Sequence, residues 1–390
     1  MSSLCERGLS TAMFDPNTYA NIRRPLLDAE TLPNWCYNSD EFYRLEVDRI
    51  FGKVWNFFGR AESIPNPGDY RTVNFVGTPI IIVRANDGSL KAFANTCRHR
   101  GARIATGDGK CRHFVCPYHG WVYNLDGSLK ACAGMEKTHN FDKAEYGLIP
   151  IRLESWGGFV FLNFDNDAEP LCDYLGDLPE QMESYNCTDL VLTCKQEYEL
   201  NCNWKLHIEN AVEQYHVPMV HRTTLQKKKC EYVETRTRGN WVNLREKHDS
   251  NTRALLEEDL SHAFPHIETL EGHAAEGTNF ICILPCTLLC LTLDSCWYVE
   301  LHPNGPHKTK ATLGCCFPSN TTKLSDFEER ATYYYKRWRT GLSEDNGISE
   351  VQHQGLLSHL ARPGRFSYME STTPLLGAWW ADRVTQNHNR

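Results

Sequence analysis

The sequence of 390 residues lacks any apolar run that approaches the roughly 18 residues needed for a membrane-spanning helix. It also lacks an excess of positive charge, because 41 lysines and arginines stand against 49 aspartates and glutamates, for a formal net charge of -8. Nothing in this balance would attract nucleic acid or an anionic membrane. We therefore expect no nucleic acid and no membrane among its partners, and small molecules and proteins instead.

The start of the chain lacks the apolar core of a secretory signal, and its early acidic residues argue against a transit peptide. Internal repeats and low-complexity tracts are absent as well. The 17 cysteines are scattered along a chain far longer than disulfide-stapled scaffolds, and Cys315 and Cys316 are adjacent. We interpret them as reduced thiols, most of them small buried hydrophobes, and predict a cytoplasmic protein.

The first half of the chain changes texture after residue 60. Residues 34–60 begin with an Asn-Ser-Asp cap signal and then show apolar positions at helical spacing, which predicts a helix followed by a strand at 55–59. From 64 to 163, short β-branched and aromatic runs alternate with glycine-containing turns, which is typical of a small all-β domain. The polar, proline-containing segment 165–185 favours a hinge.

The second half predicts a mixed fold. Residues 190–217 pass from strand-like alternation to a helical pattern, and strands recur from 278 to 317. Residues 326–360 are typical of a long helix, opened by Ser325-Asp326-Phe327-Glu328 as a capping box. We therefore predict an α+β protein: a helical segment at 1–54 that packs on the last domain, an all-β domain at 55–168, and at 169–390 an antiparallel sheet wrapped on a long C-terminal helix, a helix-grip arrangement.

Four metal-binding side chains lie in two short runs of the all-β region: Cys97, His99, Cys116 and His119. Sixteen residues separate the two pairs. Two cysteines with two histidines suit either a tetrahedral zinc ion or a Rieske [2Fe-2S] cluster, in which histidine replaces cysteine on one of the two irons. The spacing alone leaves both alternatives open.

The residues that flank these ligands, 98–101 and 117–121, closely resemble those of Rieske proteins. The resemblance implies that Cys97 and Cys116 hold one iron, while His99 and His119 hold the solvent-facing iron that passes electrons on. Cys111 lies between the pairs and matches no ligand position.

A second candidate site begins with His216 and His221, five residues apart. Two imidazoles from one helix and its end could share a metal ion only if the helix breaks, and Pro218 between them supplies such a break. Two histidines leave a third anchor to be found, which a 2-His-1-carboxylate triad provides while keeping positions open for dioxygen and substrate. Asp345 is the best donor downstream, with Glu344 as its main competitor.

Residues 203–221 resemble the mononuclear-iron motif of Rieske non-haem iron oxygenase alpha subunits, and the segment around Asp345 resembles their third-ligand helix. The resemblance covers roughly residues 35–380 and is greatest to the group of choline, glycine betaine and carnitine monooxygenases. It implies that His216, His221 and Asp345 bind mononuclear Fe(II). It also implies a homotrimer in which Glu213, where most members have aspartate, carries electrons between neighbouring subunits.

An enzyme of this family is a monooxygenase or dioxygenase that uses O2. The chain has no flavin or nicotinamide motif, so electrons from NAD(P)H must come through a separate flavin and iron-sulfur reductase. The expected reaction is hydroxylation of a C–H bond in a quaternary ammonium compound, or its oxidative N-demethylation. The alternatives are an aromatic-ring or aromatic-acid hydroxylase of the same family, and an electron carrier whose second domain has lost its iron.

Two further patterns concern the strands after residue 278. A methylammonium group would require an aromatic cage, and candidates for its wall lie between Phe280 and Tyr298. Cys282, Cys286 and Cys290 recur at every fourth residue in an apolar run. Because even separations place residues on one face of a strand, we expect buried packing on one strand rather than another iron-sulfur site.

Overall fold

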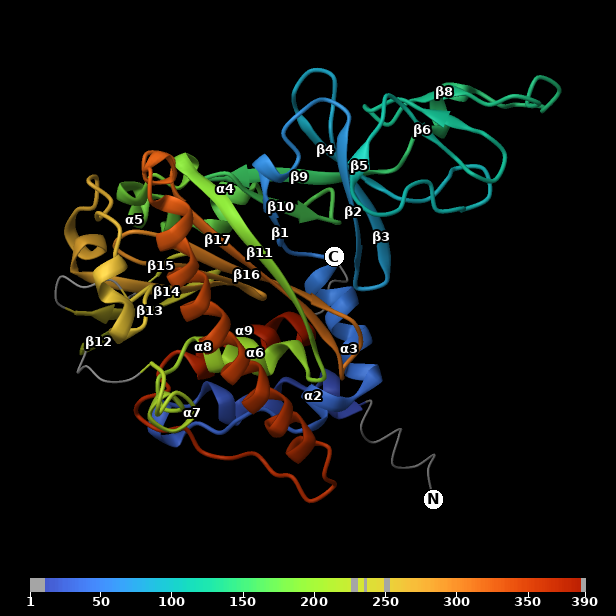
Figure 1. The fold of residues 1–390 in the computed structure, drawn as a ribbon. Helices are drawn as coiled ribbons and strands as arrows, with labels where there is room; N and C mark the ends of the chain where they lie inside the picture. Colours follow the sequence, from blue (N-terminus) through green and yellow to red (C-terminus); the bar gives the residue numbers. More distant parts are fainter. Residues whose placement is uncertain (1–10, 226–230, 235–236, 249–252, 387–390) are drawn as a thin grey trace. The chain divides into compact units, whose positions relative to one another are not determined.

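The computed structural model describes residues 11–225, 231–234, 237–248 and 253–386. The chain divides into two compact units, both visible in Figure 1. We call Phe57–Ala168 the β unit, and Met1–Asn56 together with Glu169–Arg390 the mixed unit. The finer division into three domains stays a prediction. No helix within the described ranges is both long and apolar enough to cross a membrane.

The β unit contains a seven-stranded and a three-stranded sheet, with short 3-10 helices at η4 (Ala61–Ser63) and η5 (Lys143–Tyr146). In sheet order, the larger sheet comprises β1 (Asn56–Arg60), β10 (Phe159–Asn163), β9 (Pro150–Trp156), β4 (Leu90–Ala94), β3 (Thr78–Arg84), β2 (Asp69–Phe75) and β5 (Gly109–Lys110). The smaller comprises β6 (Phe114–Val115), β7 (Val122–Tyr123) and β8 (Leu129–Ala131). The predicted all-β domain is confirmed.

The mixed unit is built on one antiparallel sheet of seven strands. Residues of β14 to β17 are almost all buried, which explains why their sequence consists of apolar runs rather than alternating residues. In sheet order the strands are β11 (Leu190–Leu200), β17 (Thr309–Pro318), β16 (Cys296–Pro303), β15 (Thr287–Leu291), β14 (Gly277–Ile283), β13 (Trp241–Lys247) and β12 (Glu231–Glu234).

The long helix α8 (Phe327–Leu356) crosses the face of this sheet, as Figure 1 shows. Trp338 of α8 lies 4.4 Å from Trp297 of β16 between ring centroids, and the ring of Tyr334 lies 5.1 Å from that of Phe317 of β17. The predicted α+β class is confirmed. The predicted capping box is wrong, because Asp326 is the N-cap residue and its side chain accepts no capping hydrogen bond.

Shorter helices from both ends of the chain complete the mixed unit. Ser39 accepts a hydrogen bond from the N–H of Phe42, as its cap signal predicts. The C-terminal α9 (Thr373–Thr385) was not predicted, and its Trp380 packs 5.1 Å from Trp204 between ring centroids. The N-terminal helices are η1 (Pro16–Arg23), η2 (Leu26–Asp28), α2 (Trp35–Asn38), α3 (Asp40–Glu46) and the π-helix η3 (Val47–Phe51). Short 3-10 helices later in the chain include η8 (Glu257–His262), η9 (Gly272–Glu276) and η10 (Thr321–Lys323).

The predicted hinge at 165–185 is a packed helical segment. Its apolar residues are buried, and the Tyr174 hydroxyl donates a hydrogen bond to the Leu284 carbonyl at 2.8 Å. These few large side chains anchor a segment that its polar composition made look exposed. The helices here are α4 (Leu171–Leu175), α5 (Leu178–Gln181), η6 (Glu183–Tyr185) and η7 (Cys187–Asp189).

The three regularly spaced cysteines are buried, as predicted, but they do not share one strand. Cys282 lies on β14, Cys286 ends the turn that follows it, and Cys290 lies on β15, where it pairs with Phe280. The turn places the cysteines on two antiparallel strands, so the expectation of a single strand is wrong. In the described residues these cysteines, like the other described ones, form no disulfide.

Candidate metal centres

Two loops of the β unit carry the first ligand set, and the same backbone hydrogen bonds close both. In the first, the N–H of Cys97 donates to the carbonyl five residues on at 2.8 Å, and the N–H of Gly101 donates to the Cys97 carbonyl at 2.9 Å. Cys116 and Gly120 repeat this pattern at 2.8 and 3.0 Å. Gly101 and Gly120 have φ angles of 71° and 69°, a left-handed conformation that favours glycine. The loops therefore present their cysteine and histidine in matching ways.

The side chains of these loops meet in two pairs. The sulfurs belong to buried residues, whereas the Nδ1 atoms of His99 and His119 face each other at 3.0 Å and His119 is exposed. The ring of Trp121 stacks on His99 at 5.1 Å between centroids. The Tyr123 hydroxyl lies 3.3 Å from Cys97 Sγ. The histidine end of the site thus faces solvent and the cysteine end faces the core.

The separation of these ligands argues against zinc. One tetrahedral zinc ion, with bonds of about 2.0–2.3 Å, would hold all four ligand atoms within about 4.6 Å of one another. Within the described ranges, only one group of three or more candidate ligand atoms lies within 4.8 Å of one another. None of these four residues belongs to that group. A cluster with two irons, each holding one pair of ligands, fits the arrangement.

The group that does gather consists of His216, His221 and Asp345 of the mixed unit. The helix α6 (Trp204–Ala211) ends before His216, and the short α7 (Val217–Val220) lies between the two histidines. Pro218 lies in the first turn of α7, so the expectation that it breaks the helix between the histidines is wrong. The end of α6 supplies the change of direction, and Asp345 comes from α8.

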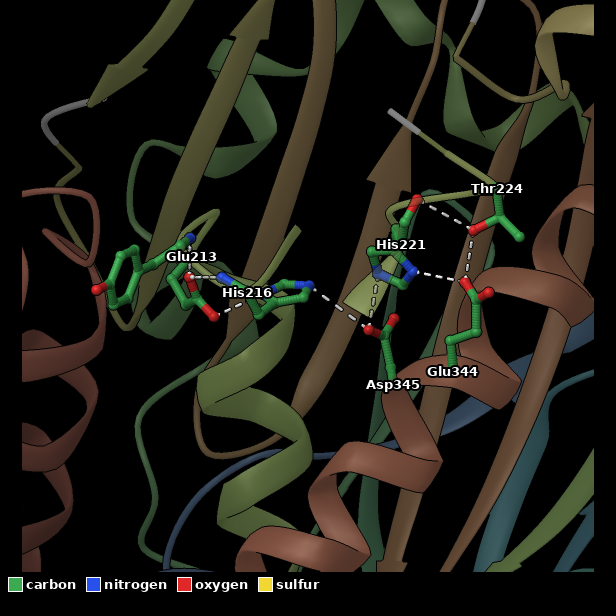
Figure 2. Close-up of polar contacts among 7 residues, drawn as sticks. Glu213, His216, His221, Thr224, Glu344 and Asp345 are labelled. Carbon is green, nitrogen blue, oxygen red and sulfur yellow. Dashed lines mark hydrogen bonds and ion pairs between the residues drawn. The ribbon is translucent and has the colours of Figure 1, made fainter. Parts of the chain in front are cut away.

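The two imidazoles turn their Nε2 atoms toward one carboxylate oxygen, as Figure 2 shows. His216 Nε2 lies 3.5 Å and His221 Nε2 lies 2.9 Å from Asp345 Oδ1. That oxygen is buried and has no hydrogen-bond partner of good geometry among the described residues. Two imidazole nitrogens and a carboxylate oxygen are ligands that Fe(II) accepts, so a divalent cation fits between them.

The opposite ring nitrogens are held by two other carboxylates (Figure 2). His216 Nδ1 lies 2.6 Å from Glu213 Oε1, and His221 Nδ1 lies 2.7 Å from Glu344 Oε2. The hydroxyl of Thr224 also donates to Glu344 Oε2, at 2.8 Å. A carboxylate on Nδ1 keeps the proton there and leaves Nε2 free for a metal. Glu344, the competitor for the ligand role, therefore supports His221 in this geometry.

A cavity in the mixed unit opens beside His216, His221 and Asp345. Phe280 and Trp297, both within the range expected to supply an aromatic wall, line it together with Trp338 of α8. Tyr298, at the end of that range, is fully buried. Three charged side chains also reach the cavity besides the candidate ligands and Glu213: Glu246, Arg253 and Arg337.

Sequence reasoning missed the supporting role of Glu344 and Thr224, and the cavity face of α8. Arg337 and Gly341 precede Asp345 by eight and four residues, so helical spacing from the proposed ligand could have found them. Thr224 and Glu344 are 120 residues apart, and no local pattern signals that contact.

Residues 188–386, just over half of the chain, match the family model of the ring hydroxylating alpha subunit (catalytic domain). Residues 54–142 match the model of the Rieske [2Fe-2S] domain. The family that the motifs resembled is confirmed.

Individual relatives agree with the family match. The chain is 35% identical to the chloroplastic choline monooxygenase of Beta vulgaris, over 54% of this chain and 47% of that protein, so this match spans about half of the relative's length. It is 28% identical to the glycine betaine monooxygenase oxygenase subunit of Chromohalobacter salexigens, over 92% of this chain and 87% of that protein.

A solved structure is similar over nearly the whole chain. The quaternary ammonium Rieske monooxygenase CntA, in complex with its substrate L-carnitine, has a TM-score of 0.77 and 25% sequence identity, over 95% of this chain and 99% of that chain. Motifs, fold and family models therefore agree: the chain belongs to the ring hydroxylating alpha subunits, oxygenases that combine a Rieske [2Fe-2S] domain with a catalytic domain binding mononuclear iron.

Proposed function

We propose that this chain is the oxygenase component of a monooxygenase that hydroxylates a C–H bond of a small quaternary ammonium compound. The observation that carries the proposal is the group of His216, His221 and Asp345, which opens on a cavity lined by aromatic side chains. The relatives named for choline, glycine betaine and carnitine support the same substrate class.

The three gathered residues would hold Fe(II) through His216 Nε2, His221 Nε2 and the Asp345 carboxylate. Such a facial triad, when loaded, activates dioxygen at its open positions with electrons from outside. Glu213 and Glu344 orient the two imidazoles and fix the proton on Nδ1. At this site the protein thus directs the Nε2 atoms of two imidazoles toward the position of the metal.

Cys97, His99, Cys116 and His119 would hold the [2Fe-2S] cluster, with the exposed His119 as the exit for electrons. We place Glu213 on the route from the cluster of a neighbouring subunit in a homotrimer, because its carboxylate is bonded to His216. A separate flavin and iron-sulfur reductase would supply the electrons from NAD(P)H.

Phe280 and Trp297 suit a methylammonium group, which aromatic faces stabilise in a desolvated site. If an N-methyl group is attacked, one oxygen atom of O2 enters its C–H bond. The other oxygen leaves as water with two electrons and two protons. The resulting hemiaminal then loses formaldehyde and gives the demethylated amine.

The test uses the metal-loaded full chain with a compatible reductase and NADH. Choline, glycine betaine, carnitine and benzoate are compared by oxygen uptake and by the product formed. We expect coupled turnover of at least one trimethylammonium compound and none of benzoate. Turnover of benzoate alone would support the alternative, an aromatic-acid hydroxylase, which the arginines of the cavity favour.

Metal content tests the electron-carrier alternative separately. We expect three irons per chain, two in the cluster and one mononuclear, because both ligand sets are complete. Two irons, with the cluster absorbance intact and no oxygen uptake with any substrate, would instead identify a carrier.

A further inference from the structure

Arg337 lies on the same face of α8 as the proposed ligand Asp345. The two positions are eight residues apart, about 12 Å along the helix, with Gly341 halfway between them. A Cβ atom at Gly341 would lie only 2.9 Å from Arg337 Nη1. The absence of that atom lets the guanidinium lie along the helix in the direction of Asp345, inside the cavity.

The charge of Arg337 has no carboxylate partner in the described part of the chain. Its Nε donates to the Arg253 carbonyl at 3.0 Å, and its guanidinium carbon lies 4.1 Å from the ring centroid of Trp338. The other arginine of the cavity, Arg253, forms an ion pair with Glu246 at 2.6 Å. Arg253 thus has an ion-pair partner, whereas among the described residues Arg337 has none at contact distance and feels Asp345 and Glu246 only from further away.

A guanidinium in this position is built to receive an anion. Burial lowers the pKa of Arg337 to about 10, so the group still carries its charge at neutral pH. With Nε engaged, the four N–H groups on Nη1 and Nη2 remain, and two of them match the two oxygens of a carboxylate. A charged group in a partly desolvated site is costly until such a partner arrives.

We propose that Arg337 binds a carboxylate of the substrate and so selects trimethylammonium carboxylates, the betaine type of compound, over choline. This proposal rests on the proposed function and narrows its substrate class. In choline a neutral hydroxymethyl group replaces the carboxylate, so choline would bring a further cation into the cavity without a carboxylate to pair with Arg337. Gly341 acts as the positioning residue, since it makes room for the guanidinium.

Glycine betaine and choline are a matched pair of probes, since both carry a trimethylammonium group on a two-carbon unit. We would measure Kd by calorimetry and KM and kcat by turnover, using the metal-loaded full chain. The wild type should bind glycine betaine at least about 10-fold more tightly than choline. Arg337→Gln should weaken glycine betaine by about 10- to 100-fold in Kd and KM, with choline and kcat changed little.

Gly341→Ala provides a second variant that should fold well, because alanine is favoured over glycine within a helix. The added Cβ displaces the far end of the Arg337 side chain and also approaches Leu225 Cδ1 at 3.2 Å. We expect Gly341→Ala to weaken the binding of glycine betaine more than that of choline. The loss for glycine betaine should be smaller than in Arg337→Gln. Arg339→Gln is the control, since Arg339 is exposed on the same helix and does not line the cavity. It should leave both Kd values unchanged.

Three results would count against the proposal. Equal binding of choline and glycine betaine by the wild type, or an equal loss of both in Arg337→Gln, would overturn the selection while the proposed function stands. Binding of benzoate that depends on Arg337, without binding of glycine betaine, would overturn both. Iron content and cluster absorbance at wild-type levels in each variant show that a changed Kd is not a failure of folding.

Discussion

The loops of the β unit and the helical site of the mixed unit present histidine through different ring nitrogens. In the loops, the Nδ1 atoms of His99 and His119 face each other. In the helical site, the Nδ1 atoms of His216 and His221 are bonded to carboxylates, and their Nε2 atoms are turned to Asp345. Since the partner of one ring nitrogen decides which nitrogen is left for a metal, the carboxylates select Nε2 in the second site.

The two sites also differ in what holds them. The loop ligands all lie within residues 97–119, and backbone hydrogen bonds and two left-handed glycines shape the loops. The helical ligands extend from His216 to Asp345 on separate elements, and ionisable side chains orient them. The first site depends on local backbone geometry, and the second depends on packing between distant segments. Substitutions should therefore affect the two sites independently.

The largest expected effect is the loss of one site with the other intact. His221→Ala removes one of three proposed ligands, so we expect about one iron per chain to be lost and substrate hydroxylation to fall below detection. The visible absorbance of the cluster should stay at the wild-type level. Cys116→Ser is the reciprocal control and should abolish that absorbance. A parallel loss of both metals in His221→Ala would contradict the independence of the sites.

The second expected effect is a dependence of the stability of the mixed unit on pH. Burial raises the pKa of Glu209 on α6 to about 7 from its usual 4.5, even though the Tyr37 hydroxyl donates to its carboxylate at 2.7 Å. The folded chain therefore binds this proton more tightly than the unfolded chain does. The resulting stabilisation is complete below about pH 4.5 and is lost as the pH rises to about 7.

Glu209→Gln should remove this dependence, because the amide oxygen still accepts from Tyr37 and does not ionise. Between pH 5 and 8 the wild type should lose up to about 3 kcal/mol more unfolding free energy than the variant. Denaturant unfolding followed by tryptophan fluorescence at both pH values measures the difference. Equal slopes of stability against pH for the two proteins would contradict a raised pKa at this position.

A third comparison distinguishes the roles of Glu344 and Glu213, the two carboxylates bonded to the Nδ1 atoms of the imidazoles. Glu344→Gln removes a charge beside His221, and we expect iron to bind about 10- to 100-fold more weakly, with activity falling in proportion. Glu213→Gln should weaken iron by a similar factor. If Glu213 also carries electrons between subunits, reoxidation of a reduced cluster should slow beyond what the lost iron explains. Stopped-flow absorbance of the cluster, in samples saturated with iron, distinguishes the two roles.

Features that depend on residues close together in the sequence were predicted better than contacts between residues far apart in it. The Rieske domain could be predicted because the motifs of the proposed loop ligands are contiguous in the sequence, and the strands after 278 because apolar runs mark them. The support of His221 by Glu344 and Thr224 could not, since it depends on how α8 packs against the end of α7. The helix α9 was missed even though Pro374 in its first turn is a helix-start signal, and tryptophan packing anchors the helix.

The wrong interpretations have a related cause. Pro218 looked like a helix breaker, but proline is well tolerated in the first turn of a helix, and α7 begins there. The segment 165–185 does contain the boundary between the two units, but it looked exposed because polar residues outnumber the few large apolar ones, which are buried. For Pro218 the position in the helix decided the outcome, and in 165–185 the burial of a few large side chains outweighed the polar composition.

The smallest expected effects come from glycine, which the two regions use for opposite reasons. Gly101 has a φ of 71° in a ligand loop, so Gly101→Ala should cost about 1–2 kcal/mol even though its Cβ would meet no atom within 4 Å. Gly347 lies within α8, where a Cβ also meets nothing, so Gly347→Ala should stabilise the helix by about 0.5–1 kcal/mol. Thermal unfolding of the two variants, each followed by the absorbance of the cluster and by far-ultraviolet circular dichroism, measures both signs. If Gly101→Ala were as stable as the wild type, the loops would not depend on backbone geometry, and the contrast with the side-chain-held helical site would be lost.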